Sequence, residues 1–355
     1  MKGKARVKKA RPGSPKEKKT SAKGGGNKRT NNTNKGAGKE KGCPPVPRVQ
    51  VPTHWKIPQL RAATEAELKT SEVKAQLTIY RQHRGPPAPE AAYKCVNEFH
   101  GHKLNFACRF FAKGKEGFCF SNFFTTPVTL YIRGFGLHTF PSAEHAYMWS
   151  VRVFPVNSSV EALRNWTVGG KYAVPAEGAN SKAKQIIGLR AKKQANAMTK
   201  AGTAAVSPFY IGVPVQQMYE HIWSHLLGAK FTQNKRLHRA LEGTGDNLLV
   251  EWSRGFSQSK FGGYLKQDGK GSYKVPMEHA SALHRCWVTN VWAGSLIPDP
   301  ANGVTHAFGY NVMGVCLTKL RRQLFGTKSR KWPNQIGQYS PDRESYVIEE
   351  ERWNP

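Results

Sequence analysis

Glu144 and His145 place a carboxylate and an imidazole side by side, two groups that commonly do acid–base chemistry. Ser142 just before them predicts the N-cap of a helix, so Glu144 falls in the first turn, where the helix dipole favours an ionised carboxylate. Tyr147 and Trp149 follow about one turn later. An ionised carboxylate beside flat aromatic surfaces suits cleavage of the bond between a sugar and a planar base. The alternative is an amphipathic helix with a solvated acidic start.

A second carboxylate, Glu251, lies near the end of the apolar run 248–252, which predicts a short buried strand. Hydrolysis of an N-glycosidic bond creates positive charge at the anomeric carbon. One carboxylate must stabilise that charge or activate water, and the leaving base must be protonated or hydrogen-bonded. A half-buried glutamate is costly unless it is paired, which favours a role with Lys230 or an arginine as partner. A structural ion pair is the alternative.

The elements that position these groups follow from hydrophobic periods and helix signals. Alternation predicts strands over 104–110 and 128–132, and helical spacing predicts helices within 176–194, 215–227 and 311–326. The run 229–234 is expected to break the second of these helices, after which Asn234 caps the next one. Asn311 is expected to cap the last helix and Gly326 to end it.

Composition divides the chain into segments. Residues 1–42 contain fifteen Lys or Arg against two Glu, a net charge of +13, and no aromatic residue, so we predict a disordered basic tail. The other predicted segments are a proline-rich linker with a short helical arm over 43–94, a main domain over 95–326 with an insertion at 253–288, and a C-terminal tail over 327–355.

The chain has 355 residues and a formal charge of +32. A polyanionic partner is therefore expected, and nucleic acid, bound through residues 1–42, fits better than a membrane. We find no apolar run of about 18 residues and no secretory signal. The basic clusters at 8–11 and 16–19 resemble a two-part nuclear import signal, and equally suit a non-specific nucleic-acid arm. We expect a nuclear or cytoplasmic protein that is not secreted.

Six short motifs, taken in order, resemble those of the NADAR domain, also known as the YbiA-like family. They are Phe120-Ser121-Asn122-Phe123, Phe140-Pro141-Ser142-Ala143-Glu144-His145, Lys230-Phe231-Thr232-Gln233-Asn234, Thr244-Gly245-Asp246 with Leu249-Val250-Glu251, Trp292-Ala293-Gly294, and Gly309-Tyr310-Asn311-Val312-Met313-Gly314. Each motif is weak alone, but the ordered set over 100–326 is hard to obtain by chance. The resemblance implies an α+β, predominantly helical single domain with a small β component.

The NADAR family consists of N-glycosidases, whose substrates include ribosylamino-pyrimidine intermediates of riboflavin synthesis and, in some members, ADP-ribose on guanine bases. The resemblance implies a similar hydrolysis here, with Glu144 and Glu251 as catalytic residues. The side chains expected to bind substrate are Asn122, Phe123, His145, Arg190, Lys230, Trp292 and Asn311. Of these, Trp292 is expected to stack on the base, and Arg190 and Lys230 are expected to bind phosphate. For His145 and Asn311, a structural histidine and a simple helix cap are equally good alternatives. We expect no cofactor and no metal.

Two departures from the family pattern favour another class of protein. The family usually has an acidic residue three positions before its motif tryptophan, where this chain has Thr289. The insertion before Trp292 is the second departure, and it could shield the site or change its substrate. Together with the positive charge, they motivate the alternative of a catalytically impaired nucleic-acid-binding or structural protein, such as a viral or chromatin component.

The six cysteines form no CxxC pair, so we expect reduced thiols. Cys95, His100, His102 and Cys108 offer four possible zinc ligands. Their C-x4-H-x-H-x5-C spacing is not that of a usual zinc finger or ribbon, which disfavours a zinc site.

Overall fold

The structure, a computed structural model, describes residues 56–99, 101–111, 116–208, 213, 215–252, 266–267, 273–274, 292–299, 304–308, 310–327 and 346–349. Its helices are α1 (Glu65–Leu68), α2 (Ser71–His83), α3 (Ala143–Met148), α4 (Val160–Arg164), α5 (Ser181–Gln185), α6 (Gly188–Lys200), α7 (Val215–Met218), α8 (Ser224–Thr232), α9 (Lys235–Glu242) and α11 (Val312–Phe325). Its strands are β1 (Leu60–Ala62), β2 (Glu98–Phe99), β3 (His102–Lys103), β4 (Ala107–Phe111), β5 (Val128–Ile132), β6 (Gly136–Phe140), β7 (Leu248–Trp252), β8 (Lys266–Gln267), β9 (Tyr273–Lys274), β10 (Ser295–Asp299), β11 (Val304–Phe308) and β12 (Tyr346–Glu349).

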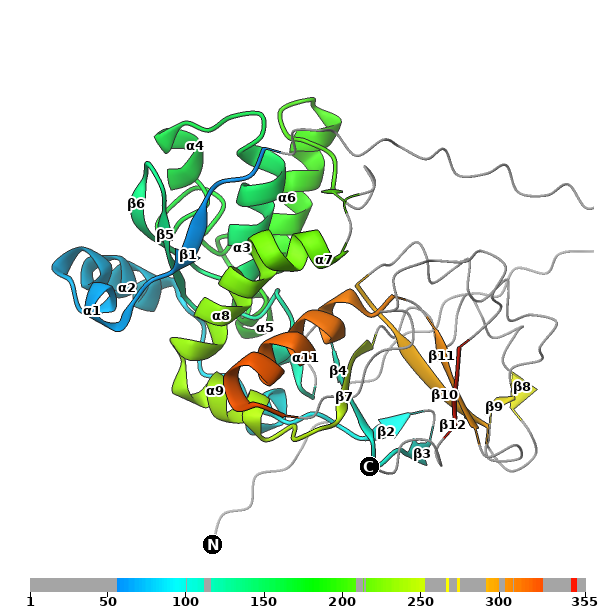
Figure 1. Cartoon of the computed structure of the whole chain (residues 1–355). Helices are drawn as coiled ribbons and strands as arrows, with labels where there is room; N and C mark the ends of the chain where they lie inside the picture. Colours follow the sequence, from blue (N-terminus) through cyan, green and yellow to red (C-terminus); the bar gives the residue numbers. More distant parts are fainter. Residues whose placement is uncertain are drawn as a thin grey trace, which may run out of the picture. The chain divides into compact units, whose positions relative to one another are not determined.

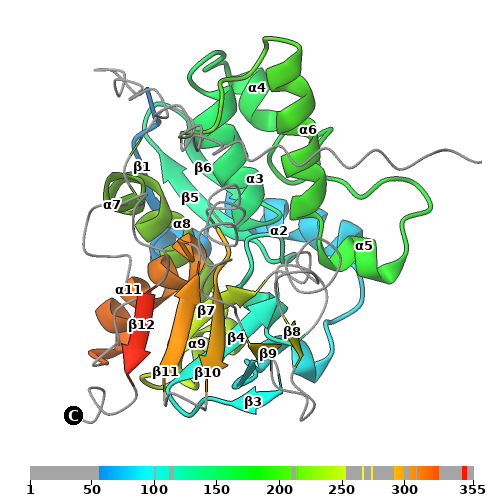
Figure 2. The same ribbon diagram turned by 90° about the vertical axis from the view of Figure 1, so that its right-hand side faces the viewer.

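The fold is α+β, as the sequence predicted, with helices packed around small separate sheets (Figure 1). β5 pairs antiparallel with β1 and β6, and β4 pairs parallel with β7. Figure 2 shows the third sheet, in which β11 lies between β10 and β12. α3 packs against both α6 and α8, while α11 packs against α8 and β7. These contacts bring the elements of Glu144 and Glu251 to the same core.

β7 lies between two hydrophobic clusters because its side chains alternate between the faces of the strand. Leu249 packs in the main cluster with residues of α3, α8 and α11, whereas Leu248 and Val250 pack in a second cluster that includes Phe99. Glu251 shares the face of Leu249, so the alternation directs its carboxyl toward the main cluster.

The N-terminal arm is held to the rest of the fold by strand pairing and by hydrogen bonds from one side chain. β1 pairs with β5, with Leu60 opposite Ile132. The side chain of Gln76 in α2 donates to the Leu137 carbonyl at 3.0 Å and accepts the Thr139 N–H at 2.7 Å. Hydrophobic period did not reveal β1, because three residues are too few to define one.

Most predicted element boundaries are confirmed. Strand 128–132 matches β5, Ser142 caps α3, Asn234 caps α9, and Gly326 ends α11 in the left-handed conformation at φ +68°. The strand predicted over 104–110 begins only at position 107. The predicted break over 229–234 is wrong because α8 continues through 229–231, which are buried in the core and contain no glycine or proline.

Two helices change to π-helical geometry at aromatic residues. α3 continues as the π-helix Trp149–Val153, and the π-helix Tyr219–Trp223 joins α7 to α8. π-helical turns are rare and often occur at functional sites. The rings of Tyr147 and Trp223 stack with centroids 4.5 Å apart, so the two segments meet in the core.

Several predictions lie outside the described residues: those for the tail 1–42, for Thr289 and for most of the insertion 253–288. Within the part of the chain that the structure describes, every helix is too short or too polar to cross a lipid bilayer.

Candidate active site

Glu144 is buried at the start of α3, with 4% of its surface exposed. Its backbone N–H donates to the Asn122 carbonyl at 3.2 Å, and its carboxyl is hydrogen-bonded by the Asn122 side chain. Burial raises the pKa of Glu144 to about 7, against the lowering effects of Lys192, Asn122 and Arg152. Burial thus opposes the ionisation that the helix dipole favours, because the cost of removing the charge of Glu144 from water is larger.

Glu251 is the second buried carboxyl of the same site. Burial raises its pKa to about 8, the negative charge of Glu144 adds to the rise, and Lys192 and Lys230 oppose it. The two predicted catalytic carboxyls thus influence each other's ionisation, although one lies on α3 and the other on β7. Two acids that interact titrate as a pair, so the proton affinity of one carboxyl depends on the charge of the other.

Lys230, at the end of α8, supplies positive charge from within the core. It is fully buried, and its Nζ donates to the Ser121 carbonyl at 2.7 Å. Burial lowers the pKa of Lys230 to about 7. Its ammonium group is therefore held by the backbone of the segment that precedes Asn122.

Lys192, on α6, is the half-buried cation of the site. It is the strongest charge lowering the pKa of both carboxyls, and its Nζ lies 5.5 Å from the centroid of the Phe123 ring. Sequence reasoning missed Lys192. The available signal was its place one helical turn after Gly188, within the helical region predicted over 176–194.

Gly188 allows α6 to begin directly against the Glu144 site. A Cβ atom at this position would lie 2.7 Å from Phe123 Cα and 2.9 Å from Glu144 Cβ. Because neither atom lies at the end of a flexible side chain, only glycine fits without a shift of the helix. This residue was also missed, since one glycine in a helical pattern gives no sign of what packs against it.

Asn122 contributes an unpaired acceptor to the site. The residue is 8% exposed, and its Oδ1 has no hydrogen-bond partner among the described residues. Buried polar atoms are normally paired, so this oxygen is available to a bound ligand. Phe123, also buried, follows directly. The structure therefore brings both of these predicted substrate-binding residues to the carboxyl pair.

His145 and Arg190 are instead engaged by protein atoms. Nε2–H of His145 donates to the Tyr172 carbonyl at 3.1 Å, so the neutral ring accepts at Nδ1 from the Ser142 hydroxyl at 2.8 Å. Burial lowers the pKa of His145 to about 4, which keeps the ring neutral. Arg190 donates to two backbone carbonyls of the loop 171–174. This geometry favours the structural alternative for His145.

Asn311 joins α11 to β7 and does not cap its own helix through its side chain. Its Oδ1 accepts the Glu251 N–H at 3.0 Å, and its Nδ2 donates to the Leu249 carbonyl at 2.7 Å. Asn311 stands at the N-cap position of α11, as predicted, but its backbone is left-handed, at φ +48°, and its side chain bonds the strand instead of the first helical turn. Gly314 permits this approach, since a Cβ there would lie 2.0 Å from the Leu249 carbonyl oxygen.

Trp292 packs edge-on against two core aromatic rings. Its centroid lies 5.4 Å from that of Tyr147 and 5.3 Å from that of Trp223. Tyr147 is buried within electrostatic reach of Glu144, whereas Trp292 is half-buried. An aromatic surface therefore lies next to the carboxyl pair.

The described residues contain no group of three or more His, Cys, Asp or Glu placed to hold a metal ion. Cys95 and Cys108, two of the zinc ligands weighed above, are hydrogen-bonded neighbours. His102 lies on β3, and His100 is outside the described residues.

The fold and the site define an α+β protein with two buried carboxyls of raised pKa, flanked by lysine, amide and aromatic side chains. One member of such a pair can donate a proton while the other stabilises a developing positive charge. Comparison of the chain with protein-family models, with curated proteins and with solved structures finds no match.

Proposed function

We propose that this protein is an N-glycosidase that hydrolyses an N-ribosyl or ADP-ribosyl bond to a nucleobase or pyrimidine. The observation that carries the proposal is the coupling of Glu144 and Glu251 in one buried site, with pKa values of about 7 and about 8. The ordered motifs that resemble the NADAR family lend further support. Two other residues of these motifs, Asn122 and Lys230, interact with the carboxyls of this same site.

The singly protonated pair supplies both groups that the hydrolysis needs. In this mechanism Glu251 holds the proton and donates it to the leaving nitrogen as the C1′–N bond breaks. The bonding electrons leave with the base. Ionised Glu144 stabilises the positive charge at C1′ and takes a proton from the water that adds there. Transfer of that proton within the coupled pair restores the starting state.

The surrounding side chains orient the substrate in this proposal. Oδ1 of Asn122 accepts a hydrogen bond from a ribose hydroxyl or a base amino group, because it is the unpaired acceptor next to Glu144. Phe123 and Trp292 offer aromatic surfaces to the base. Lys192 favours ionisation of the pair and so keeps it singly protonated near neutral pH.

Nucleic acid is the proposed partner that presents the substrate, because the net charge is +32 and residues 1–42 alone contribute +13. The absence of an acidic residue at Thr289 favours the second candidate, a nucleic-acid-binding or structural protein without activity. A glycosidase assay of the purified full chain separates the two candidates. Release of ADP-ribose from ADP-ribosylated guanine, or cleavage of a ribosylamino-pyrimidine phosphate, supports the enzyme. Tight nucleic-acid binding without turnover of either substrate overturns it.

A further inference from the structure

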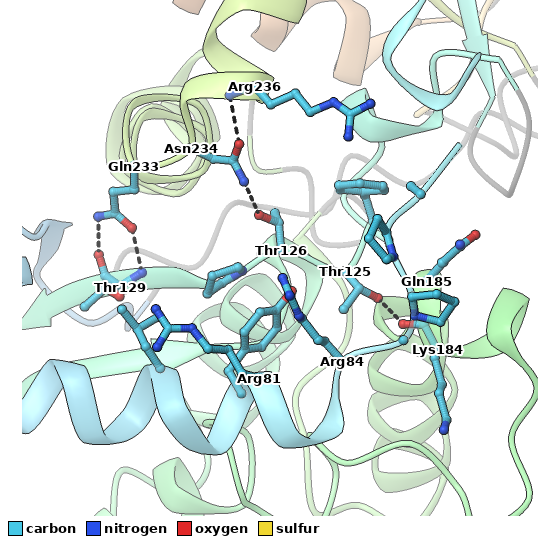
Figure 3. Close-up of a pocket in the computed structure, with 18 of the residues that line it drawn as sticks. Arg81, Arg84, Thr125, Thr126, Thr129, Lys184, Gln185, Gln233, Asn234 and Arg236 are labelled. Carbon is cyan, nitrogen blue, oxygen red and sulfur yellow. Dashed lines mark hydrogen bonds between the residues drawn. The ribbon is translucent and has the colours of Figure 1, made fainter. Parts of the chain in front are cut away.

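A cavity of about 500 Å³ lies between the N-terminal arm and the rest of the fold (Figure 3). α2 forms one wall, and the junction of α8 and α9 forms the wall across from it. The loop 85–88, the segment 124–127 and the end of α5 also line it. None of these lining residues belongs to the carboxyl site.

The cavity is strongly basic. Four of its lining side chains are cationic, namely Arg81, Arg84, Lys184 and Arg236, and none of the described lining residues is acidic. Arg236 pairs with Glu90 and lies 3.7 Å from the centroid of the Tyr93 ring.

The other three cations are uncompensated. Arg81, Arg84 and Lys184 make no side-chain hydrogen bond or ion pair within the described part of the chain. Figure 3 shows Arg84 extending from α2 toward Thr126, with Arg236 on the other side of the cavity. Arg81 lies in the last turn of α2, and Arg84 is the residue that ends the helix.

The polar wall that faces these cations is held in place. The Gln233 side chain bonds both the N–H and the carbonyl of Thr129, at 2.9 and 2.8 Å. Asn234 donates to the Thr126 hydroxyl at 3.4 Å. Gly85 brings the arm close to α5, because a Cβ there would lie 2.7 Å from Lys184 Cβ. The wall across from the cations is thus fixed in the fold, so a ligand does not have to order it.

We propose that this cavity binds a phosphate group of a nucleotide or of a nucleic-acid backbone. Guanidinium groups match phosphate oxygens in a bidentate geometry, and an ammonium group adds a point charge. Three uncompensated cations balance a phosphate or diphosphate, and the volume accommodates a nucleotide-sized ligand. The proposal does not rest on the glycosidase activity, because no residue of the carboxyl pair lines the cavity.

The cavity and the carboxyl site nonetheless share one segment of chain. Asn122 and Phe123 lie at the carboxyl pair, whereas Phe124, Thr125 and Thr126 line the cavity. An anion bound by Arg84 beside Thr126 therefore contacts the same segment that positions Asn122.

The test measures the affinity of the full chain for inorganic pyrophosphate by calorimetry at fixed salt. The variant Arg81→Gln/Arg84→Gln removes two cavity charges, and Lys74→Gln/Lys200→Gln removes two exposed charges elsewhere. We expect at least a tenfold loss of affinity in the first variant and less than a twofold change in the second. Equal losses in both variants, or no binding by the wild type, overturn the proposal.

Two further measurements locate the bound anion in the cavity and identify the kind of molecule that supplies the phosphate. Pyrophosphate should protect Arg81 and Arg84 from phenylglyoxal in the wild-type chain, as read by peptide mass spectrometry, and unchanged labelling contradicts the site. A mononucleotide and a 12-nucleotide single strand are then compared in both variants. Selective loss of mononucleotide binding identifies a nucleotide site, selective loss of strand binding identifies a backbone site, and loss of neither overturns the proposal.

Discussion

The Asn311 side chain accepts the backbone N–H of Glu251 at 3.0 Å and donates to the carbonyl of Leu249 at 2.7 Å. One amide group thus ties the strand of the second carboxyl to the start of α11. Glu251 lies in an extended strand, whereas the backbone of Asn311 is left-handed. The position of Glu251 therefore depends on a residue that lies 60 positions further along the chain.

Asn311→Ala should destabilise the protein by about 2–4 kcal/mol, because two buried backbone groups lose their partners and alanine disfavours φ +48°. Asn311→Gly keeps the backbone conformation and loses only the hydrogen bonds, so it should cost less. Thermal unfolding of both variants checks this order. Equal melting temperatures for Asn311→Ala and the wild type would show that these hydrogen bonds do not stabilise the fold.

Glu144→Gln should stabilise the fold increasingly as the pH rises from 5 to 8. Burial raises the folded-state pKa of Glu144 from 4.5 to about 7, so the folded protein binds this proton more tightly than the unfolded chain. The contribution of protonated Glu144 to the free energy of unfolding is fully present below about pH 4.5 and is lost as the pH rises through about 7. At about 1.4 kcal/mol per pKa unit, the variant should gain up to about 3 kcal/mol over the wild type.

The contribution of Lys230 to folding stability changes with pH in the opposite direction to that of Glu144. For this reason the pH test compares a variant with the wild type. The folded-state pKa of Lys230 is lowered from 10.5 to about 7, so its cost is greatest at low pH and fades as the pH rises toward 10.5. Subtracting the wild-type melting curve from that of Glu144→Gln removes this background. A difference that stays constant from pH 5 to 8 contradicts the raised pKa of Glu144.

Lys192→Met should move the pH optimum of activity to higher pH. Lys192 is the strongest charge that lowers the pKa of both carboxyls, so its removal raises both values and with them the range in which the pair holds one proton. Lys193→Met, at an exposed position on the same helix, is the matched control. Superimposable pH–rate profiles for Lys192→Met and the control would exclude Lys192 from the site.

Gly188→Ala should lower both stability and activity, because the added Cβ would press on Phe123 Cα and Glu144 Cβ. Overpacking of this kind costs about 1–3 kcal/mol. Gly228→Ala, in α8, whose added Cβ meets no atom within 4 Å, controls for the general cost of replacing a helical glycine. Activity retained in full by Gly188→Ala would show that the spacing of α3 and α6 does not matter to the reaction.

The parts of the site that sequence predicts are those with local signals. Ser142 marks the start of α3, and the apolar run around Glu251 marks a buried strand, because caps and hydrophobic runs act over a few residues. Local sequence does not predict that α3 and the strand of Glu251 lie close together. Their proximity depends on β7 pairing with β4 and on α11 packing against β7, contacts between distant segments.

Burial also reverses what local reasoning says of ionisation. The helix dipole predicts an ionised Glu144, but its surroundings are known only once α6 and β7 are placed around it. Asn311 shows the same limit, since its position before α11 indicates a cap while its side chain bonds a strand. Lys192 was missed because its one local signal, its place one turn after Gly188, gains meaning only once Gly188 is known to pack against Glu144.

Turnover of ADP-ribosylated guanine and of a ribosylamino-pyrimidine phosphate by the full chain, beside its Glu144→Gln variant, tests the proposed glycosidase most directly. Exposed Glu177→Gln is the matched control. We predict release of the base by the wild type and the control, and a loss of at least about 100-fold in Glu144→Gln, the effect of removing an acid–base group. Full activity in Glu144→Gln, or no turnover of either substrate by the wild type, would contradict the proposed reaction at the carboxyl pair.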